Sequence, residues 1–164
     1  MSEKITEKKA MMLKQNTYWG CGLYAVANAL DMPEFITDER LEVSKEKGNN
    51  IAQLTKWLNK DGCDWFIVAE YITGRSVEMP MLYWSDEDDD GYYVPLIVQL
   101  PADNECCHMI AIRCYEDRLL IFDSAADKVV EGNSMADFRK LYPKIVAIYA
   151  FADYGDFNRL KIKI

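Results

Sequence analysis

The spacing of hydrophobic and polar residues divides the chain into an early helical part and a later part built of strands. After the Gly20-Cys21-Gly22 tripeptide, the alanine-rich residues 23–30 favour a helix that begins at or beside the cysteine, and Pro33 prevents it from continuing. Hydrophobic residues three or four positions apart predict a second helix over residues 50–59, and a shorter helix is expected within residues 38–47. We therefore expect the helices to precede the sheet.

From residue 64 onwards, stretches rich in β-branched and aromatic residues are separated by turn residues. They predict strands over residues 65–68, 92–100, 108–115, 118–123 and 145–151, with a short helix over residues 134–142. Helices first and antiparallel strands afterwards are typical of an α+β fold. Because no repeat or linker divides the chain, residues 1–164 are expected to form one domain, with fraying expected within residues 1–12.

The strands 108–115 and 118–123 form a hairpin whose turn decides where the only histidine lies. With a two- or four-residue loop around Glu116-Asp117, the numbers of paired residues sum to 233, which places His108 and Asp123 on the same face. A three-residue loop would place them on opposite faces. In the first register, His108 shares its face with an apolar wall formed by Ile110, Ile112 and Cys114. The first helix is expected to pack on this wall, which would bring Cys21 to the histidine.

Composition and charge disfavour several classes of protein. Half of the residues are hydrophobic, which argues against a disordered chain, and no apolar run approaches the roughly 20 residues of a membrane span. The net charge of the chain is −8, and five acidic side chains lie consecutively in residues 86–90, so the rest of the chain has a net charge of only −3. A mildly acidic chain without clustered Lys and Arg is not typical of a nucleic-acid-binding protein.

The cysteines indicate a reducing compartment. Their number is five, which is odd, and Cys106 and Cys107 are adjacent, in a chain large enough to fold without disulfides. Residues 1–9 are rich in charge and lack the apolar core of a secretory signal. We therefore expect a cytoplasmic location, whereas the sequence predicts no oligomeric state.

One of the cysteines, Cys21, has the surroundings of a nucleophile. A helix N-terminus favours the thiolate, and a glycine on each side allows a sharp turn and the close approach of a substrate to the sulfur. An ordinary buried thiol is the alternative interpretation. His108 is the single histidine of the chain, so any Cys/His mechanism must use it, although a lone histidine on a strand is more often structural.

Several segments of the chain resemble segments of a known protein family. Residues Gln15-Asn16-Thr17-Tyr18-Trp19-Gly20-Cys21-Gly22, followed by a helix of small residues, resemble the active-site segment of papain-like cysteine peptidases. Later segments resemble the double-glycine leader peptidase domains of bacteriocin exporters, at residues 94–98, 107–112, 120–125 and 134–138. Those domains commonly carry Asp-Pro where this chain has Asp123-Ser124. The resemblance covers residues 13–151.

The resemblance implies a papain-like fold in which the nucleophile helix packs on an antiparallel sheet. It implies Cys21 as nucleophile, His108 as general base and then general acid, Asp123 as the partner that orients the histidine, and Gln15 as oxyanion donor. The reaction would cleave a peptide or isopeptide bond in a peptide or protein substrate through a thioester, with no metal or cofactor. Residues beside the nucleophile and the histidine are expected to line the substrate site: Tyr18, Trp19, Gly20, Gly22 and Cys107.

Other interpretations are open. A Cys, His and Asp in this order also occur in transglutaminase-like and arylamine acyltransferase relatives, so acyl transfer is an alternative to hydrolysis. Cys106-Cys107-His108 are ligand types that suit zinc, but adjacent cysteines in an extended segment point to opposite faces. Residues 86–91 match the start of a calcium loop, but position twelve is Ile97 rather than glutamate, which favours a solvated acidic loop.

The main rival interpretation is a papain-like domain that binds or has a structural role without turnover, for example in a phage virion. Such a domain has no need for the complete set of Gln15, Cys21, His108 and Asp123. We therefore favour an enzyme.

Overall fold

The computed structural model describes residues 12–16, 19–76, 81–84, 93–102, 107–126, 128–155 and 160–163. The first elements are α2 (Cys21–Leu30), the 3-10 helix η1 (Pro33–Phe35), α3 (Asp38–Lys47) and α4 (Ile51–Lys60). The strands that follow are β1 (Trp65–Ile72), β2 (Met81–Trp84), β3 (Val94–Pro101), β4 (Cys107–Cys114), β5 (Leu119–Phe122) and β6 (Val130–Gly132). The last elements are α5 (Met135–Leu141), β7 (Ala147–Asp153) and β8 (Leu160–Lys163). The predicted α+β class is confirmed, and the fraying expected before Met12 lies outside the described residues.

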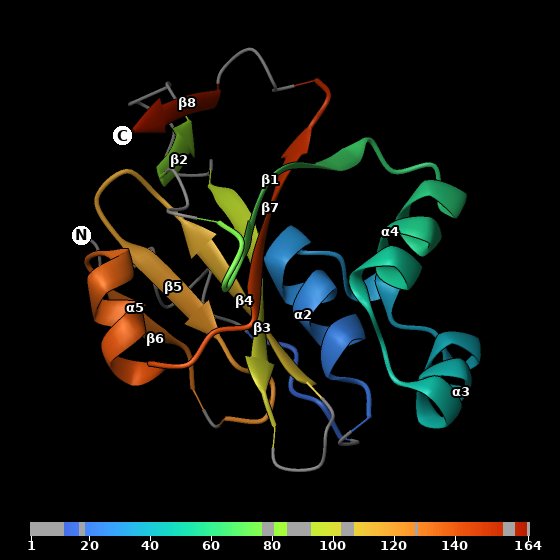
Figure 1. Cartoon of the computed structure of the whole chain (residues 1–164). Helices are drawn as coiled ribbons and strands as arrows, with labels where there is room; N and C mark the ends of the chain where they lie inside the picture. The colour runs from blue at the N-terminus through green and yellow to red at the C-terminus, as the bar shows by residue number, and fades with distance from the viewer. Residues whose placement is uncertain are drawn as a thin grey trace.

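A six-stranded antiparallel sheet forms the centre of the fold. Its strand order is β1-β7-β3-β4-β5-β6, and β2 pairs with β8 in a separate ribbon. Figure 1 shows α2, α3 and α4 on one side of the large sheet and α5 on the other. Each face of the sheet contributes to its own hydrophobic cluster, so the helices on the two sides pack independently.

The helices begin and end where the sequence supplies local signals. The Thr37 side chain accepts a hydrogen bond from the backbone N–H of Arg40 at the start of α3, and Asn50 does the same for Gln53 at the start of α4. α2 ends at Leu30, and its C-cap residue Asp31 has a φ of 53°, in the left-handed region. The predicted helix bounds are confirmed to within one residue, and no helix in the described part of the chain is long and apolar enough to cross a membrane.

The two faces of β4 have different neighbours, because successive side chains of a strand point to opposite faces. Met109 and Ala111 belong to the hydrophobic cluster that contains α2. The residues that alternate with them, Ile110, Ile112 and Cys114, belong to the cluster on the other face, which also contains Phe138 of α5. The expectation that α2 packs on this apolar wall is therefore wrong, since α5 covers the wall instead.

The hairpin of β4 and β5 has the register predicted for an even loop. The numbers of each pair sum to 233, as for Ala111 with Phe122. The backbone N–H of Tyr115 donates to the carbonyl oxygen of Arg118 at 2.9 Å, which closes a turn of two residues. The register prediction is confirmed. In this register, Asp123, directly after β5, lies on the same face of the hairpin as His108 of β4.

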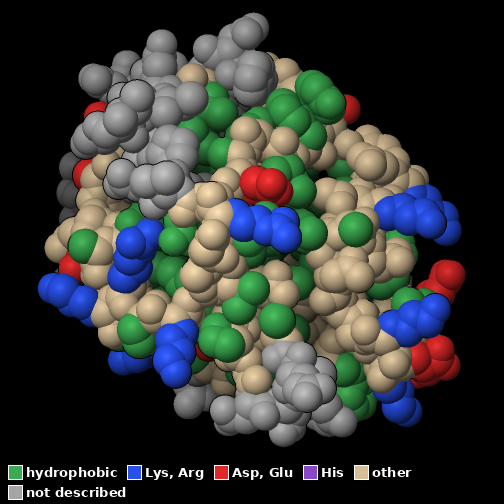
Figure 2. Space-filling view, viewed as in Figure 1, with side chains coloured by type: hydrophobic (Ala, Val, Ile, Leu, Met, Phe, Trp, Pro, Cys, Tyr) green, Lys and Arg blue, Asp and Glu red, His purple; other side chains and the backbone are tan. Residues whose placement is uncertain are grey.

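Three short strands were not predicted, namely β2, β6 and β8. β6 has only three residues, and β2 and β8 have four each, so none of them shows a clear alternation of polar and apolar positions. Figure 2 shows that Lys and Arg side chains lie at separate places on one face of the molecule, some of them beside Asp or Glu side chains.

Candidate active site

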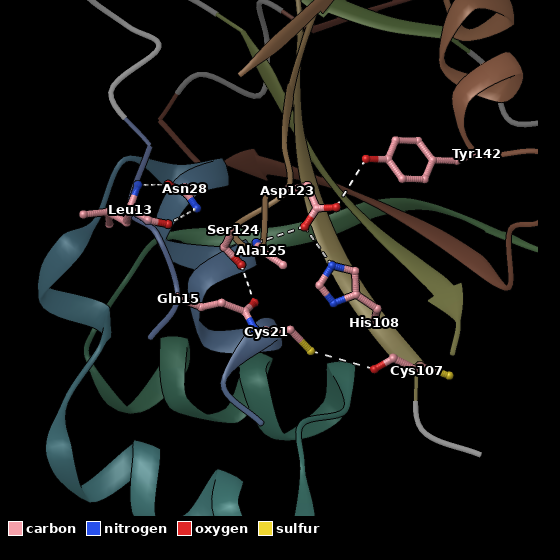
Figure 3. A network of polar contacts seen from close by, with 10 residues as sticks. All are labelled: Leu13, Gln15, Cys21, Asn28, Cys107, His108, Asp123, Ser124, Ala125 and Tyr142. Carbon is pink, nitrogen blue, oxygen red and sulfur yellow. Dashed lines mark hydrogen bonds and ion pairs between the residues drawn. The ribbon is translucent and has the colours of Figure 1, made fainter. Parts of the chain in front are cut away.

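Three elements bring the predicted nucleophile, base and orienting residue to one end of the large sheet. Cys21 is the first residue of α2, His108 is the second residue of β4, and Asp123 directly follows β5. Figure 3 shows the His108 ring between the carboxylate of Asp123 and the sulfur of Cys21. The structure therefore brings together three side chains that are far apart in the sequence.

The position of the Cys21 sulfur depends on where β5 ends. β5 pairs with β4 from Cys114 as far as Ala111, so β4 continues past its neighbour towards residue 107. The sulfur lies beside this part of the strand, where the thiol donates to the carbonyl oxygen of Cys107 at 3.8 Å and the backbone N–H of Met109 stabilises the thiolate. The first residue of α2 thus reaches the histidine around the edge of β4, although the helix packs on the opposite face.

The contact between His108 and Asp123 orients the imidazole. Nε2 of His108 lies 2.8 Å from Oδ1 of Asp123, which leaves Nδ1 on the side of Cys21. The backbone N–H of Ala125 donates to the same Oδ1 at 3.0 Å, and the Tyr142 hydroxyl donates to Oδ2 at 3.3 Å. Because these donors hold the carboxylate in one orientation, the ring also has one preferred orientation.

The same contacts shift the pKa values of all three groups. Burial opposes the charge of the Cys21 thiol, but hydrogen bonds from His108 and from the backbone of Met109, with the charge of His108, lower its pKa from the ordinary 9.0. The hydrogen bond to Asp123, followed by the one to Cys21, raises the pKa of His108 from 6.5 to about 9. Burial also opposes the charge of Asp123, yet the hydrogen bond with His108 lowers its pKa. These directions favour a thiolate beside an imidazolium at neutral pH.

Gln15 lies beside the nucleophile, in the extended segment before α2. Its backbone N–H donates to the carbonyl oxygen of Ser124 at 3.0 Å, and the Ser124 hydroxyl donates to its side-chain Oε1 at 2.6 Å. Figure 3 shows the carboxamide of Gln15 next to Cys21. The predicted oxyanion donor and the predicted nucleophile are therefore neighbours.

The segment that carries Gln15 is attached to α2 by a buried asparagine. Asn28, which is 1% exposed, accepts a hydrogen bond from the backbone N–H of Leu13 at 2.8 Å and donates to its carbonyl oxygen at 3.0 Å. The Asn28 carbonyl accepts two hydrogen bonds from the guanidinium of Arg113 in β4, at 3.0 and 2.7 Å. α2 is thus tied to both the Gln15 segment and β4, which keeps the site residues in fixed relative positions.

The two glycines that flank the nucleophile are buried. Gly20 is the N-cap residue of α2. At Gly22, an added Cβ would lie 2.5 Å from the Cβ of Asn49, so the asparagine occupies the space of the missing side chain. Gly22 thus has a packing role, because it makes room for Asn49, and the access of a substrate to the sulfur beside it stays a prediction.

Of the other residues expected to line the substrate site, the structure describes Trp19 and Cys107. The half-buried Trp19 has the ammonium nitrogen of Lys45 5.7 Å from its ring centre. Cys107 contacts the thiol of Cys21 through its carbonyl oxygen, while its own sulfur points away (Figure 3). Tyr18 lies outside the described residues.

The side chains of Ser124 and Tyr142, which contact Gln15 and Asp123, were not predicted. Ser124 directly follows Asp123 in the sequence, and this position next to a predicted site residue could have indicated that it lies at the site. Tyr142 was placed at the end of a predicted helix, and only the packing of α5 against the sheet brings its hydroxyl to the aspartate.

The alternative cation sites involve residues outside the described part of the chain, namely Cys106 and residues 86–91. Within the described ranges, no group of three or more His, Cys, Asp or Glu side chains is arranged to hold a metal ion.

Comparisons with known proteins assign no family. No family model matches the chain, and no curated protein is significantly similar to it. The basis for inferring a function is therefore the arrangement of Cys21, His108, Asp123 and Gln15.

Proposed function

We propose that this protein is a papain-like cysteine peptidase, or a related thiol amidohydrolase, that cleaves a peptide or isopeptide bond through a thioester on Cys21. The observation that carries the proposal is the placement of the His108 ring, which contacts Asp123 through Nε2 and turns its other ring nitrogen towards Cys21. Gln15 beside the sulfur supplies a donor for the oxyanion. A domain that only binds a partner has no use for this four-residue arrangement.

The first half of the proposed reaction transfers an acyl group to the sulfur. The Cys21 thiolate attacks the carbonyl carbon of the substrate, and the electron pair of the C=O bond moves onto oxygen. The oxyanion accepts hydrogen bonds from the Gln15 carboxamide and from the backbone N–H of Cys21 at the helix start, and one such donor contributes about 3 kcal/mol. When the C–N bond breaks, Nδ1–H of His108 protonates the leaving amine.

The second half hydrolyses the thioester. His108, now neutral, takes a proton from water as the water oxygen attacks the acyl carbon, and the C–S bond then breaks. The acid product leaves, and the site returns to a thiolate beside an imidazolium. An amine that replaces water at this step would give acyl transfer, so products formed in the presence of an added amine distinguish the two reactions.

The proposal is tested with a library of peptides derived from a digested proteome, analysed by mass spectrometry for newly formed termini. The wild type is compared with Cys21→Ala, with His108→Ala and with Cys63→Ala, which removes a half-buried thiol outside the site. We expect new termini with the wild type and with Cys63→Ala, and none with the other two variants.

Two results would contradict the proposal. Cleavage that persists in Cys21→Ala would assign the activity to other residues. No cleavage, combined with alkylation of Cys21 no faster than that of Cys63, would support a binding or structural role instead.

A further inference from the structure

The residue after the orienting aspartate, Ser124, contacts the other half of the site. The residue is 1% exposed, so its hydroxyl needs a partner within the protein. That partner is Oε1 of Gln15, at 2.6 Å, and the backbone N–H of Gln15 donates to the Ser124 carbonyl oxygen at 3.0 Å. Gln15 is thus held at both its backbone and its side chain by one residue.

The side-chain contact determines which way the carboxamide faces. A glutamine amide accepts hydrogen bonds only at oxygen and donates only from nitrogen. A hydroxyl that donates to Oε1 therefore holds the oxygen on its own side and turns Nε2 to the opposite side, which faces Cys21 (Figure 3). With the amide reversed, an oxygen would face the developing negative charge and repel it.

We propose that Ser124 is a positioning residue that holds Nε2 of Gln15 towards the oxyanion, and this inference rests on the proposed function. Asp123 and Ser124 are adjacent, and their turn is closed by hydrogen bonds from the backbone of Ala125 to the Asp123 carboxylate, at 3.0 Å, and of Ala126 to its carbonyl, at 2.8 Å. One rigid dipeptide thus orients the histidine with its first residue and the oxyanion donor with its second.

Two small probes separate this role from a general structural one. Acylation by p-nitrophenyl acetate passes through an oxyanion, whereas alkylation by iodoacetamide displaces iodide at a saturated carbon and forms none. Both rates at Cys21 are measured for the wild type, Ser124→Ala, Gln15→Ala and the double variant. Ser76→Ala, which removes a serine hydroxyl that accepts from the Ile72 backbone outside the site, is the control.

We expect Ser124→Ala to lower the acylation rate about tenfold and to leave the alkylation rate within about twofold of the wild type. Gln15→Ala should lower acylation by roughly 10²-fold, and adding Ser124→Ala to it should have no further effect. Ser76→Ala should change neither rate. Ser124→Thr keeps the hydroxyl and should retain most of the acylation rate in protein that alkylates normally.

An unchanged acylation rate in Ser124→Ala, equal losses with both probes, or independent losses in the double variant would overturn the role of Ser124. Failure of the parent proposal looks different, because the wild-type acylation rate would then be no higher than that of Cys21→Ala.

Discussion

Replacing Asp123 by alanine removes the hydrogen bond that is the largest cause of the raised pKa of His108. In the wild type this pKa is about 9, against 6.5 for an ordinary histidine. The same carboxylate holds the ring through the 2.8 Å contact between Nε2 and Oδ1. We therefore expect Asp123→Ala to lower the pKa of His108 and to release the ring from its orientation towards Cys21.

The size of the change follows from the contacts. A pKa unit is about 1.4 kcal/mol, so the difference between 6.5 and about 9 corresponds to ~3 kcal/mol in favour of the imidazolium. Solvent screens part of this, since the side chains of His108 and Asp123 are 26% and 19% exposed, and the Cys21 thiolate supplies a share that the variant keeps. We expect a loss of about half, ~1.5 kcal/mol, which moves the midpoint of the histidine titration down by about one pH unit.

Proton NMR measures this midpoint directly, because His108 is the only histidine and its ring signals need no assignment. The wild type and Asp123→Ala are titrated from about pH 5 to about pH 10. Asp137→Ala is the control, since its carboxylate accepts from the Asn133 backbone outside the site. A midpoint that stays near its wild-type position in Asp123→Ala, or that falls equally in Asp137→Ala, would refute the assignment of Asp123 as the orienting partner.

Labelling, packing and pH dependence each give a separate check. Brief treatment with iodoacetamide at neutral pH should label Cys21 ahead of Cys114 in mass spectrometric mapping, because burial raises the pKa of Cys114 to about 12, whereas at Cys21 hydrogen bonds outweigh burial and lower the pKa. Gly22→Ala should lower the free energy of unfolding in urea by about 2 kcal/mol, since its Cβ would lie 2.5 Å from that of Asn49, and Asn49→Gly should recover part of the loss. In Cys21→Ala, the raised pKa of His108 should stabilise the fold fully below pH 6.5, and this contribution should be lost as the pH rises through the folded value. In the wild type the lowered pKa of Cys21 acts in the opposite direction, so the free energy of unfolding should fall less steeply with rising pH than in Cys21→Ala, as denaturation at a series of pH values would show.

The parts of the site that were predictable depend on local rules. A helix that starts at Cys21 follows from the small residues after it, and the common face of His108 and Asp123 follows from the parity of a two-residue turn. Both rules act within one element or one hairpin, so no knowledge of the remaining fold is needed.

The remaining features depend on competition between distant elements. Whether α2 or α5 covers the Ile112 face of β4 is decided by which helix fits that face, and the strand pattern is the same in both cases. The packing of Asn49 against Gly22 was not predictable, because Asn49 lies on a loop with no sequence signal. The Tyr142 hydroxyl meets Asp123 only through tertiary packing.

The early end of β5 makes the site sensitive to the length of a strand that carries no catalytic side chain. β5 stops at Phe122, and the sulfur of Cys21 takes the place beside Cys107 that a longer β5 would occupy. An insertion that extended the pairing past Ala111 would displace the thiol, although every site residue would still be present. The chain should therefore tolerate length changes at the exposed Glu116-Asp117 turn, provided that they keep an even loop, far better than within residues 123–126.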